Sequence, residues 1–449
     1  MNKVEHKLSI SYKITIPTTL HMVTMKDFYT VSEVADMLGT TKETLRRWNK
    51  SGKLVPQRHP FNNYRVYQTS DLKQFGQIGF MFRDSIIPDD ELPLKKYNSI
   101  ELFAGAGGLA LGLEKAGLTN ILLSEIDKNA CETLRKNRPE WNVIEGDVGQ
   151  IDFKPHKDKV DVLTGGFPCQ AFSFAGKRLG FEDARGTLFF EFARAVKETQ
   201  PLICVGENVR GLFQHENGKT IEGMVSVLGE LGYEVIPPKV LKAIFYNVPQ
   251  KRERVFIVGL RKDAGLNFEW PLESNEIFTV KDALKQGRLF SSDVPVSQGQ
   301  AYPKAKREIM DLIPPGGYWR DLPIDLQKSY MKGSFHLTGG KTGMARRISW
   351  DEPSLTLTCA PAQKQTERCH PDETRPFTIR EYARIQTFTD DWEFAGSLTS
   401  QYAQIGNAVP VNLAEAVGRS IVRTLNAYYS DVRRSSFPLF DETLEAAIA

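Results

Sequence analysis

Three features that would place the chain in a distinct class of protein are missing from the sequence. None of its apolar runs is long enough to span a bilayer, and the first ten residues, MNKVEHKLSI, contain no signal-peptide core. The five cysteines form no CxxC pair, and Cys359, Cys369 and His370 lack a fourth ligand, so neither a disulfide framework nor a metal site is predicted. Charge is balanced, with 58 Lys and Arg against 55 Asp and Glu. These absences predict a cytoplasmic protein without a membrane segment, in which a free thiol stays reduced.

From residue 98 onward the sequence alternates between strand and helix patterns. Short apolar runs such as SIELF, NILLSEID, VDVLT and LICVGENV are each followed by a segment with helical periodicity. This order predicts an α/β fold with a doubly wound, Rossmann-like parallel sheet. After RVFIVGL the alternation stops, and residues 261–375 are rich in proline, glycine and polar residues. We expect a small irregular domain there, and a last helix from Leu413 to Asn426.

Residues 28–76 have a different character. Thr30 and Glu33 form a capping box ahead of apolar residues at helical spacing, and Thr40 and Glu43 repeat this box before a second short helix. Two capped helices joined across a glycine predict a helix-turn-helix, and FNNYRVY suits a small β-wing after it. This part of the sequence resembles the winged helix-turn-helix of the MerR and excisionase type.

Positive charge is concentrated on the second of these helices. Residues 40–70 contain seven Lys or Arg and one acidic residue, Glu43. Lys42, Arg46 and Lys50 recur at helical spacing, which would present them to a phosphate backbone or a major groove. A solvated basic face without a partner is the alternative. The DNA contacts expected in this region are Lys42, Arg46, Arg47, Lys50 and Arg65.

A glycine-rich loop follows the first strand of the α/β region. Gly105, Gly107 and Gly108 precede a helix, and Glu125 stands twenty positions after the first of them, at the end of the next strand. This spacing is typical of nucleotide-binding folds, where glycines let the backbone approach the ligand and the helix N-terminus faces an anion. The anion could be a pyrophosphate or the carboxylate of S-adenosylmethionine. Glu125 would take ribose hydroxyls, and Asp147, ending the third strand, would receive an amino group such as that of adenine.

Reactive groups end the following strands. In GGFPCQAFS, Cys169 leaves the carboxyl end of a strand, where open α/β sheets bind ligands. Glu207 ends the next strand at the same edge. A thiol and a carboxyl side by side suggest covalent catalysis, in which one group attacks and the other transfers a proton. In QKRERVFIVG, the alternation places Gln250, Arg252 and Arg254 on one face. That face suits an anionic or carbonyl-bearing substrate, with an exposed edge strand as the alternative.

Taken in order, these motifs resemble those of DNA methyltransferases that act on carbon 5 of cytosine. The matching segments are FAGAGG, SEID, GDV, GGFPCQAFS, ENV, QKRERVFIVG, RPFTIREYARIQTF and QYAQIGNAVP. The region 261–375, which follows QKRERVFIVG, falls where that family carries its target recognition domain. The expected organisation is a flexible arm (1–27), the helix-turn-helix (28–76), a linker (77–97), a catalytic domain (98–260), a target recognition domain (261–375), a return to the catalytic domain (376–427) and a tail (428–449).

The resemblance also implies roles for individual residues. Cys169 would add to carbon 6 of a cytosine flipped out of the duplex, while Glu207 holds ring nitrogen 3 and the amino group. Arg254 would hold the ring carbonyl and Arg252 would position the thiol, while Gln250 joins the expected DNA contacts. The methyl donor would be S-adenosylmethionine, although the family often has a tryptophan where this chain has an isoleucine, at position 126. The implied cofactor-binding residues are Phe103, Gly105, Gly107, Gly108, Glu125, Ile126, Asp147, Pro168 and Asn407.

The expected function is methylation of cytosine within a short sequence of double-stranded DNA. The chain would act as a monomer at the bacterial nucleoid, as the modification enzyme beside a separate restriction endonuclease, and its N-terminal domain could regulate its own transcription. A transfer-RNA cytosine methyltransferase is an alternative, but the Cys-Phe-Thr signature of that group is absent. A regulator with an inactive methylase half would be expected to have lost catalytic residues that are present here. A nicotinamide dehydrogenase would leave Cys169 and Glu207 without a role.

Overall fold

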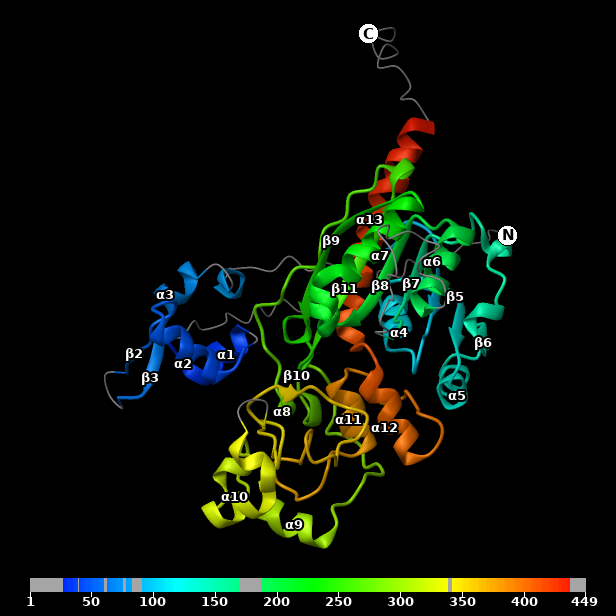
Figure 1. Cartoon of the computed structure of the whole chain (residues 1–449). Coiled ribbons are helices and arrows are strands. Elements are labelled where there is room, and N and C mark those ends of the chain that lie inside the picture. The colour runs from blue at the N-terminus through cyan, green and yellow to red at the C-terminus, as the bar shows by residue number, and fades with distance from the viewer. Residues whose placement is uncertain are drawn as a thin grey trace, which may run out of the picture.

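A seven-stranded sheet forms the centre of the molecule (Figure 1). The computed structural model describes residues 27–38, 40–59, 63–75, 78–82, 91–168, 187–337 and 341–436. The strands lie in the order β6-β5-β4-β7-β8-β11-β9. Their bounds are β4 (Tyr97–Leu102), β5 (Leu118–Glu125), β6 (Val143–Glu145), β7 (Val162–Gly165), β8 (Ile203–Val209), β9 (Tyr233–Lys242) and β11 (Glu253–Arg261).

Five of these strands, from β6 to β8, run parallel, which confirms the predicted α/β fold with a Rossmann-like sheet. The chain moves outward from β4 to β5 and β6, then crosses back to β7 on the other side of β4. The carboxyl ends of β4 and β7 therefore form the switch point at which open α/β sheets bind ligands.

The remaining two strands differ from the all-parallel prediction. Strand β11 pairs antiparallel with both β8 and β9. The sequence pattern did not indicate β9, because Pro237 and Pro238 interrupt it. The structure accommodates both prolines at the sheet edge, where the register shifts between Phe256 and Val258 of β11. An edge strand tolerates proline because one row of its N–H groups has no strand to pair with.

Helices cover both faces of the sheet. Side chains on β8 and β11 alternate between two core clusters: Val205 and Phe256 pack with α4 and α13, whereas Cys204 and Val255 pack with α6 and α7. This burial on both faces explains the almost continuously apolar strands. The bounds are α4 (Gly108–Lys115), α5 (Lys128–Asn137), α6 (Leu188–Thr199), α7 (Lys219–Glu230) and α13 (Val411–Ser436). Helix α13 is longer at both ends than the predicted last helix.

The N-terminal region folds around its own small core, built from residues such as Val34, Leu45 and Leu72. Its elements are β1 (Phe28–Thr30), α1 (Val31–Met37), α2 (Lys42–Lys50), β2 (Gln57–Arg58), β3 (Arg65–Gln68) and α3 (Thr69–Gln74), and the strands pair in the order β1-β3-β2. The capping box at Thr30 is present. The cap of α2 is Thr41, one position after the predicted Thr40, because the side chain that reaches the N–H of the third helical residue is that of Thr41. Residue 39, the predicted junction, lies outside the described residues.

Residues 261–375, called the recognition region below, contain short helices and loops around a core that includes Met310, Trp319 and Met331. Its elements are α8 (Val280–Leu284), α9 (Lys304–Asp311), α10 (Ile324–Met331) and β12 (Ser354–Leu355), and α11 (Ile379–Ile385) and α12 (Leu398–Asn407) follow it. Strand β12 pairs with β10 (Gln250–Lys251), which ties this region to the entry of β11. Across the described residues, no helix combines the length and apolarity needed to cross a membrane.

Candidate active site at the switch point of the sheet

Glycines shape the loop that follows β4. Gly105 and Gly107 have φ angles of +53° and +84°, in the left-handed region that glycine enters without strain. A Cβ at Gly105 would meet no atom within 4 Å, so the space in front of the loop is open there. A Cβ at Gly108 would lie 2.2 Å from the carbonyl oxygen of Val409. The first glycine therefore leaves room for a ligand, whereas the third lets residues 406–410 pack against the start of α4.

Glu125 ties this loop to the end of β5. Its Oε2 accepts a hydrogen bond from the backbone N–H of Gly105 at 2.7 Å, and its Oε1 accepts from the N–H groups of Ile126 and Asp127, each at 2.8 Å. Ile126 is 73% exposed, and the carboxylate of Asp147 after β6 is exposed as well. The side chains of Ile126 and Asp147 are thus exposed to solvent at the same end of the strands as the glycine loop.

Of the other expected cofactor residues, Phe103 begins the glycine loop itself, and Pro168 and Asn407 lie on two further segments. Phe103 has a φ of +58°, which is uncommon for a residue with a Cβ and marks the sharp turn out of β4. Pro168 is exposed at the end of the segment that follows β7. Asn407 is also exposed, and its Oδ1 accepts a hydrogen bond from the Cys359 thiol at 3.0 Å.

A buried carboxyl that the sequence reasoning missed lies beside them. Glu101 on β4 is only 2% exposed, and its Oε2 has no hydrogen-bond partner among the described residues. Burial raises the pKa of Glu101 well above its usual value, and the nearby carboxyls of Glu207 and Glu125 raise it further. An acidic residue within the apolar strand SIELF was the signal that could have identified it, since strands covered on both faces are otherwise apolar.

Glu207 and Arg254 face one another from the neighbouring strands β8 and β11. Arg254 Nε lies 2.8 Å from Glu207 Oε1, and both residues are buried. Burial raises the pKa of Glu207, although the guanidinium groups of Arg254 and Arg252 oppose this effect. A Cβ at Gly166 would lie 3.2 Å from Glu207 Oε2, so the loop leaving β7 passes directly beside this carboxyl. Cys169, three residues further along that loop, lies outside the described residues.

Arg252 is buried without a bonded carboxylate. It donates from Nη1 to the carbonyl oxygen of Leu357 at 3.1 Å and from Nη2 to that of Gly406 at 2.8 Å. Gln250 corrects an expectation, because its side chain is fully buried rather than available to DNA. Its Nε2 donates to Gln386 Oε1 at 2.9 Å, and its Oε1 accepts from the N–H of Leu357 at 2.9 Å. Gln250 therefore helps to fix the segment that holds Arg252.

Comparison with known proteins establishes the family to which this chain belongs. Residues 97–423 match the family model of the C-5 cytosine-specific DNA methylase. The chain belongs to this family. It is a DNA (cytosine-5) methyltransferase, referred to below as the methylase. Residues 30–67 match the model of the MerR family regulatory protein, which agrees with the helix-turn-helix at the N-terminus.

Individual relatives of the methylase support the same assignment. It is 63% identical over 404 residues to the Type II methyltransferase M.Eco47II of Escherichia coli, covering 90% of this chain and 97% of that protein. It is 56% identical over 407 residues to the Type II methyltransferase M.PspPI of a Psychrobacter strain, covering 90% and 98%. The crystal structure of a DNA modification methyltransferase encoded within an Escherichia coli prophage has a TM-score of 0.57 at 24% identity, covering 74% of this chain and 100% of that one. This last likeness supports the fold.

The helix-turn-helix of the methylase presents its basic residues to solvent. The five expected DNA contacts in this region are all exposed: Lys42, Arg46, Arg47, Lys50 and Arg65. Two further side chains of the wing, Arg58 and the 72% exposed Tyr64, share a surface hollow with Lys42 and Arg65. The sequence RHPFNNYRVY, which begins at Arg58, carried the signal for them, since basic residues interleaved with aromatics are typical of nucleic-acid contacts.

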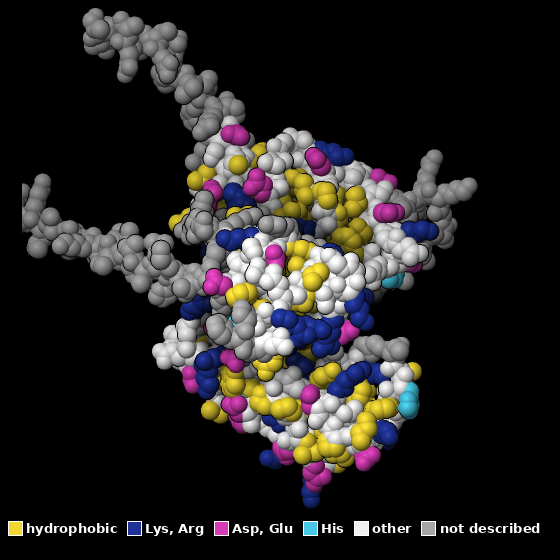
Figure 2. Space-filling view, turned by 90° about the vertical axis from the view of Figure 1, so that its left-hand side faces the viewer, with side chains coloured by type: hydrophobic (Ala, Val, Ile, Leu, Met, Phe, Trp, Pro, Cys, Tyr) yellow, Lys and Arg dark blue, Asp and Glu magenta, His cyan; other side chains and the backbone are white. Residues whose placement is uncertain are grey.

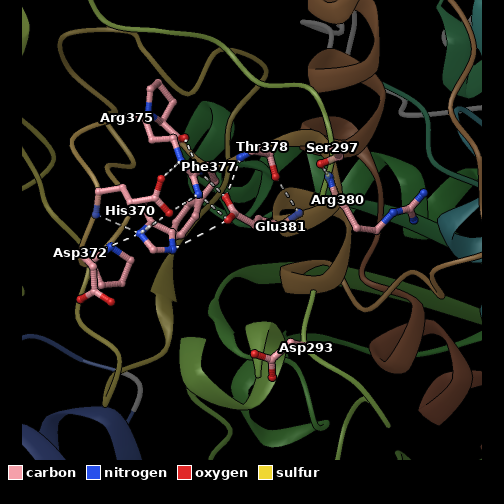
Figure 3. Close-up of polar contacts among 12 residues, drawn as sticks. Asp293, Ser297, His370, Asp372, Arg375, Phe377, Thr378, Arg380 and Glu381 are labelled. Atoms are coloured by element: carbon pink, nitrogen blue, oxygen red, sulfur yellow. Dashed lines mark hydrogen bonds and ion pairs between the residues drawn. The ribbon is translucent and has the colours of Figure 1, made fainter. Parts of the chain in front are cut away.

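A polar cluster joins the recognition region of the methylase to α11 (Figure 3). His370 Nδ1 accepts hydrogen bonds from the N–H groups of Asp372 and Glu373, at 3.2 and 3.1 Å. Arg375 donates to both carboxylate oxygens of Glu381, at 2.8 and 2.9 Å. The histidine is thus engaged in a turn that connects the two parts of the chain. Within the part of the chain that the structure describes, no group of His, Cys, Asp and Glu side chains is arranged to hold a metal ion.

Proposed function

We propose that the methylase transfers a methyl group from S-adenosylmethionine to carbon 5 of a cytosine within a short specific sequence of duplex DNA. It would act as a monomer in the bacterial cytoplasm, as the modification enzyme of a restriction–modification system with a separate endonuclease. The observation that carries this proposal is the buried Glu207–Arg254 pair, because it stands beside the loop that leads to Cys169. The names of the Type II methyltransferase relatives support the modification role.

The residues around the glycine loop fit S-adenosylmethionine. This cofactor is cationic at its sulfonium and amino groups, and a nearby positive charge would favour the ionised form of the buried Glu101 carboxyl, whose Oε2 has no hydrogen-bond partner among the described residues. Open space at Gly105 leaves room for the ligand, and the exposed side chain of Ile126 offers an apolar surface for adenine. Glu125 and Asp147 would hold the ribose hydroxyls and the adenine amino group, with Phe103, Gly107, Gly108, Pro168 and Asn407 completing the site. When bound, the cofactor supplies an electrophilic methyl group.

The remaining chemistry belongs to the chain and the base. Carbon 5 of cytosine is too weak a nucleophile to accept a methyl group unaided. We propose that the Cys169 thiolate adds to carbon 6, forming a carbon–sulfur bond that makes carbon 5 enamine-like. Burial raises the pKa of Glu207, which favours its protonated form, and we propose that this proton is presented to ring nitrogen 3, so that the charge created by the addition is neutralised. After methyl transfer, a solvent base takes the hydrogen on carbon 5 as a proton, the electron pair of that bond restores the ring double bond and expels the thiolate, and Glu207 takes back the proton from ring nitrogen 3.

The two arginines would act through position and charge. Arg254 is held against Glu207 through Nε and donates from Nη1 to the carbonyl oxygen of Glu253, and its remaining N–H groups would hold the ring carbonyl of the flipped base. Arg252 is fixed to main-chain carbonyls of two separate segments, which would keep its positive charge beside the thiolate. A neighbouring positive charge lowers the pKa of a thiol and increases the reactive fraction.

We further propose that the helix-turn-helix binds duplex DNA and lets the methylase regulate its own transcription. The exposed cations of α2 and the wing support this role. The test is a reporter gene fused to the promoter of the methylase gene and expressed with the full-length protein. Repression that is lost on changing Arg46→Gln together with Arg47→Gln supports the role. Equal reporter output with both proteins contradicts it.

The principal experiment is to express the methylase in a host without cytosine methylation and to map 5-methylcytosine across the host DNA. Cys169→Ser is the control. Modification at one short motif that disappears in the Cys169→Ser protein would support the enzyme, its nucleophile and its specificity together. Unmodified DNA from folded, cofactor-binding protein would overturn the proposal and direct attention to transfer RNA.

A further inference from the structure

Glu352 reaches from the recognition region onto the helix-turn-helix. It stands two residues before β12, and its Oε1 accepts a hydrogen bond from Ser32 Oγ at 3.0 Å. The same oxygen lies 3.4 Å from the Nζ of Lys42, the first residue of α2. Arg346 Nη2 lies 3.7 Å from the other oxygen. Although burial alone would raise the pKa of Glu352, Lys42 and Lys251 lower it below its usual value, so the carboxylate is charged.

A second contact fixes the same junction. Asp36 of α1 is 93% buried and pairs with Lys251 Nζ of β10 at 2.5 Å. Lys242 Nζ donates to the carbonyl oxygen of Leu38 at 2.6 Å. The helix-turn-helix is therefore docked against the catalytic chain, and the Glu352–Lys42 contact is part of a defined interface rather than an isolated surface pair.

Lys42 also belongs to a basic hollow on the surface of the helix-turn-helix. The hollow has a volume of about 470 Å³ and is lined by Thr30, Val31, Ser32, Lys42, Arg58, Tyr64 and Arg65. Three cations and no carboxylate line it, so it suits a polyanion. Figure 2 looks onto the side of the molecule that carries the helix-turn-helix, and Lys and Arg side chains gather in the middle of that side. Several phosphates of a DNA duplex can contact the cations of such a surface at the same time.

Two of the residues that contact Glu352, Ser32 and Lys42, thus also line the hollow. A phosphate entering the hollow and the carboxylate of Glu352 would compete for one ammonium group. The Lys42 side chain is 52% exposed, so it can turn from one partner to the other, while the 21% exposed Glu352 keeps the Ser32 hydroxyl and the Arg346 guanidinium beside it.

We propose that Glu352 belongs to the DNA-binding surface of the helix-turn-helix, where it holds Lys42 in the absence of DNA and releases it to a backbone phosphate when a duplex binds. The partner is duplex DNA, and the inference rests on the proposed DNA binding by this domain. Because Glu352 leads into β12, whose partner β10 directly precedes Arg252, the exchange takes place at the junction between the two parts of the chain that would contact DNA.

The test measures binding of full-length protein to a fluorescent duplex made only of A·T pairs. Such a duplex contains no cytosine and cannot accept a methyl group. Glu352→Gln keeps an acceptor for Ser32 but removes the charge that holds Lys42. We expect the affinity at low salt to rise about two- to five-fold, as the loss of one exposed ion pair allows. We also expect the slope of log K against log salt to stay at its wild-type value, because Lys42 neutralises a phosphate in both complexes.

Two controls define the result. Asp351→Asn removes the same charge one residue away, at a carboxylate that forms no ion pair with Lys42 in the described structure, and should leave the affinity unchanged within error. Adding Lys42→Gln to Glu352→Gln should remove the gain in affinity, because the cation that Glu352→Gln releases is then missing. That result would show that the two side chains act as one unit. A Glu352→Gln protein that binds no more tightly than wild type at low salt, or a gain that persists without Lys42, would overturn the inference.

The failure of this inference is distinguishable from the failure of the proposed function. If Arg46→Gln and Arg47→Gln leave binding of the A·T duplex unchanged, the helix-turn-helix is not the binding surface and both proposals are wrong. If these substitutions weaken binding while Glu352→Gln does not tighten it, only the role of Glu352 is wrong.

Discussion

The candidate active site around Glu207, called the sheet edge here, and the helix-turn-helix both concentrate cationic side chains, but they hold them in opposite ways. At the sheet edge, Arg252 is 2% exposed and bonded to two main-chain carbonyls, and Arg254 is locked against Glu207. On α2, by contrast, the Arg46–Glu43 pair is open to solvent on both sides. Buried charge fixed in advance is strong because water does not screen it, and it tolerates little change. Exposed charge acts additively and weakens as salt rises.

The largest effect should come from the buried guanidinium. In Arg252→Lys, a single ammonium group cannot span the carbonyl oxygens of Leu357 and Gly406, so we expect the methyl-transfer rate to fall about 100-fold. Single-turnover methylation measures this. Arg261→Lys is the matched control, because Arg261 also donates to a main-chain carbonyl, that of Gln200, but at the far end of β11. Equal losses in the two variants would contradict the comparison.

The second test concerns the close packing of the glycine loop after β4. Gly108→Ala would place a Cβ 2.2 Å from the Val409 oxygen, so we expect the free energy of unfolding to fall by about 1–3 kcal/mol. Urea titration with and without S-adenosylmethionine measures this. Gly229→Ala on α7 meets nothing within 4 Å and should instead stabilise by about 0.5–1 kcal/mol. A tolerated Gly108→Ala would show that residues 406–410 are not clamped to α4.

A third test uses the buried acid without a partner. The pKa of Glu101 is raised in the folded state, so its stabilising contribution is complete at low pH and is lost as the pH rises through that raised pKa. We expect the melting temperature of Glu101→Gln to exceed that of wild type by an amount that grows with pH. Bound S-adenosylmethionine should narrow this gap by supplying positive charge. Glu308→Gln, at an exposed carboxyl on α9, should show no such trend.

The smallest effect is expected on the exposed side. Arg65→Gln should weaken binding to the A·T duplex at low salt and flatten the salt slope by about 0.9, since one phosphate contact is lost. The difference should vanish at about 0.5 M salt, where exposed charges are screened. Fluorescence anisotropy across a salt series measures it. A deficit that persists at high salt would place Arg65 with the buried, preorganised cations instead.

Features determined within a short stretch of sequence were predictable. The strand and helix alternation, the glycine loop and the acid at the end of β8 follow from local patterns, and the structure contains them. Residues fixed by distant partners were not predictable. Gln250 is buried against Gln386, which lies 136 positions away in the sequence. A local alternation of residues does not indicate such a contact. Strand β9 was hidden by two prolines that only an edge position tolerates. The return of Asn407 to the glycine loop was expected from the family resemblance alone.

Helix α13 determines when during translation the methylase can become active. The core that joins α4 to the sheet includes Leu413, Val417 and Ile421, and Gly108 packs against the Val409 carbonyl. A ribosome releases β4, the glycine loop and β8 well before these residues exist, so the nascent sheet carries an open apolar face and an unsupported loop. The core of the helix-turn-helix draws its buried residues from positions 34–82 and is complete much earlier. The N-terminal domain therefore folds first, and methyl transfer can begin only after almost the whole chain has been made.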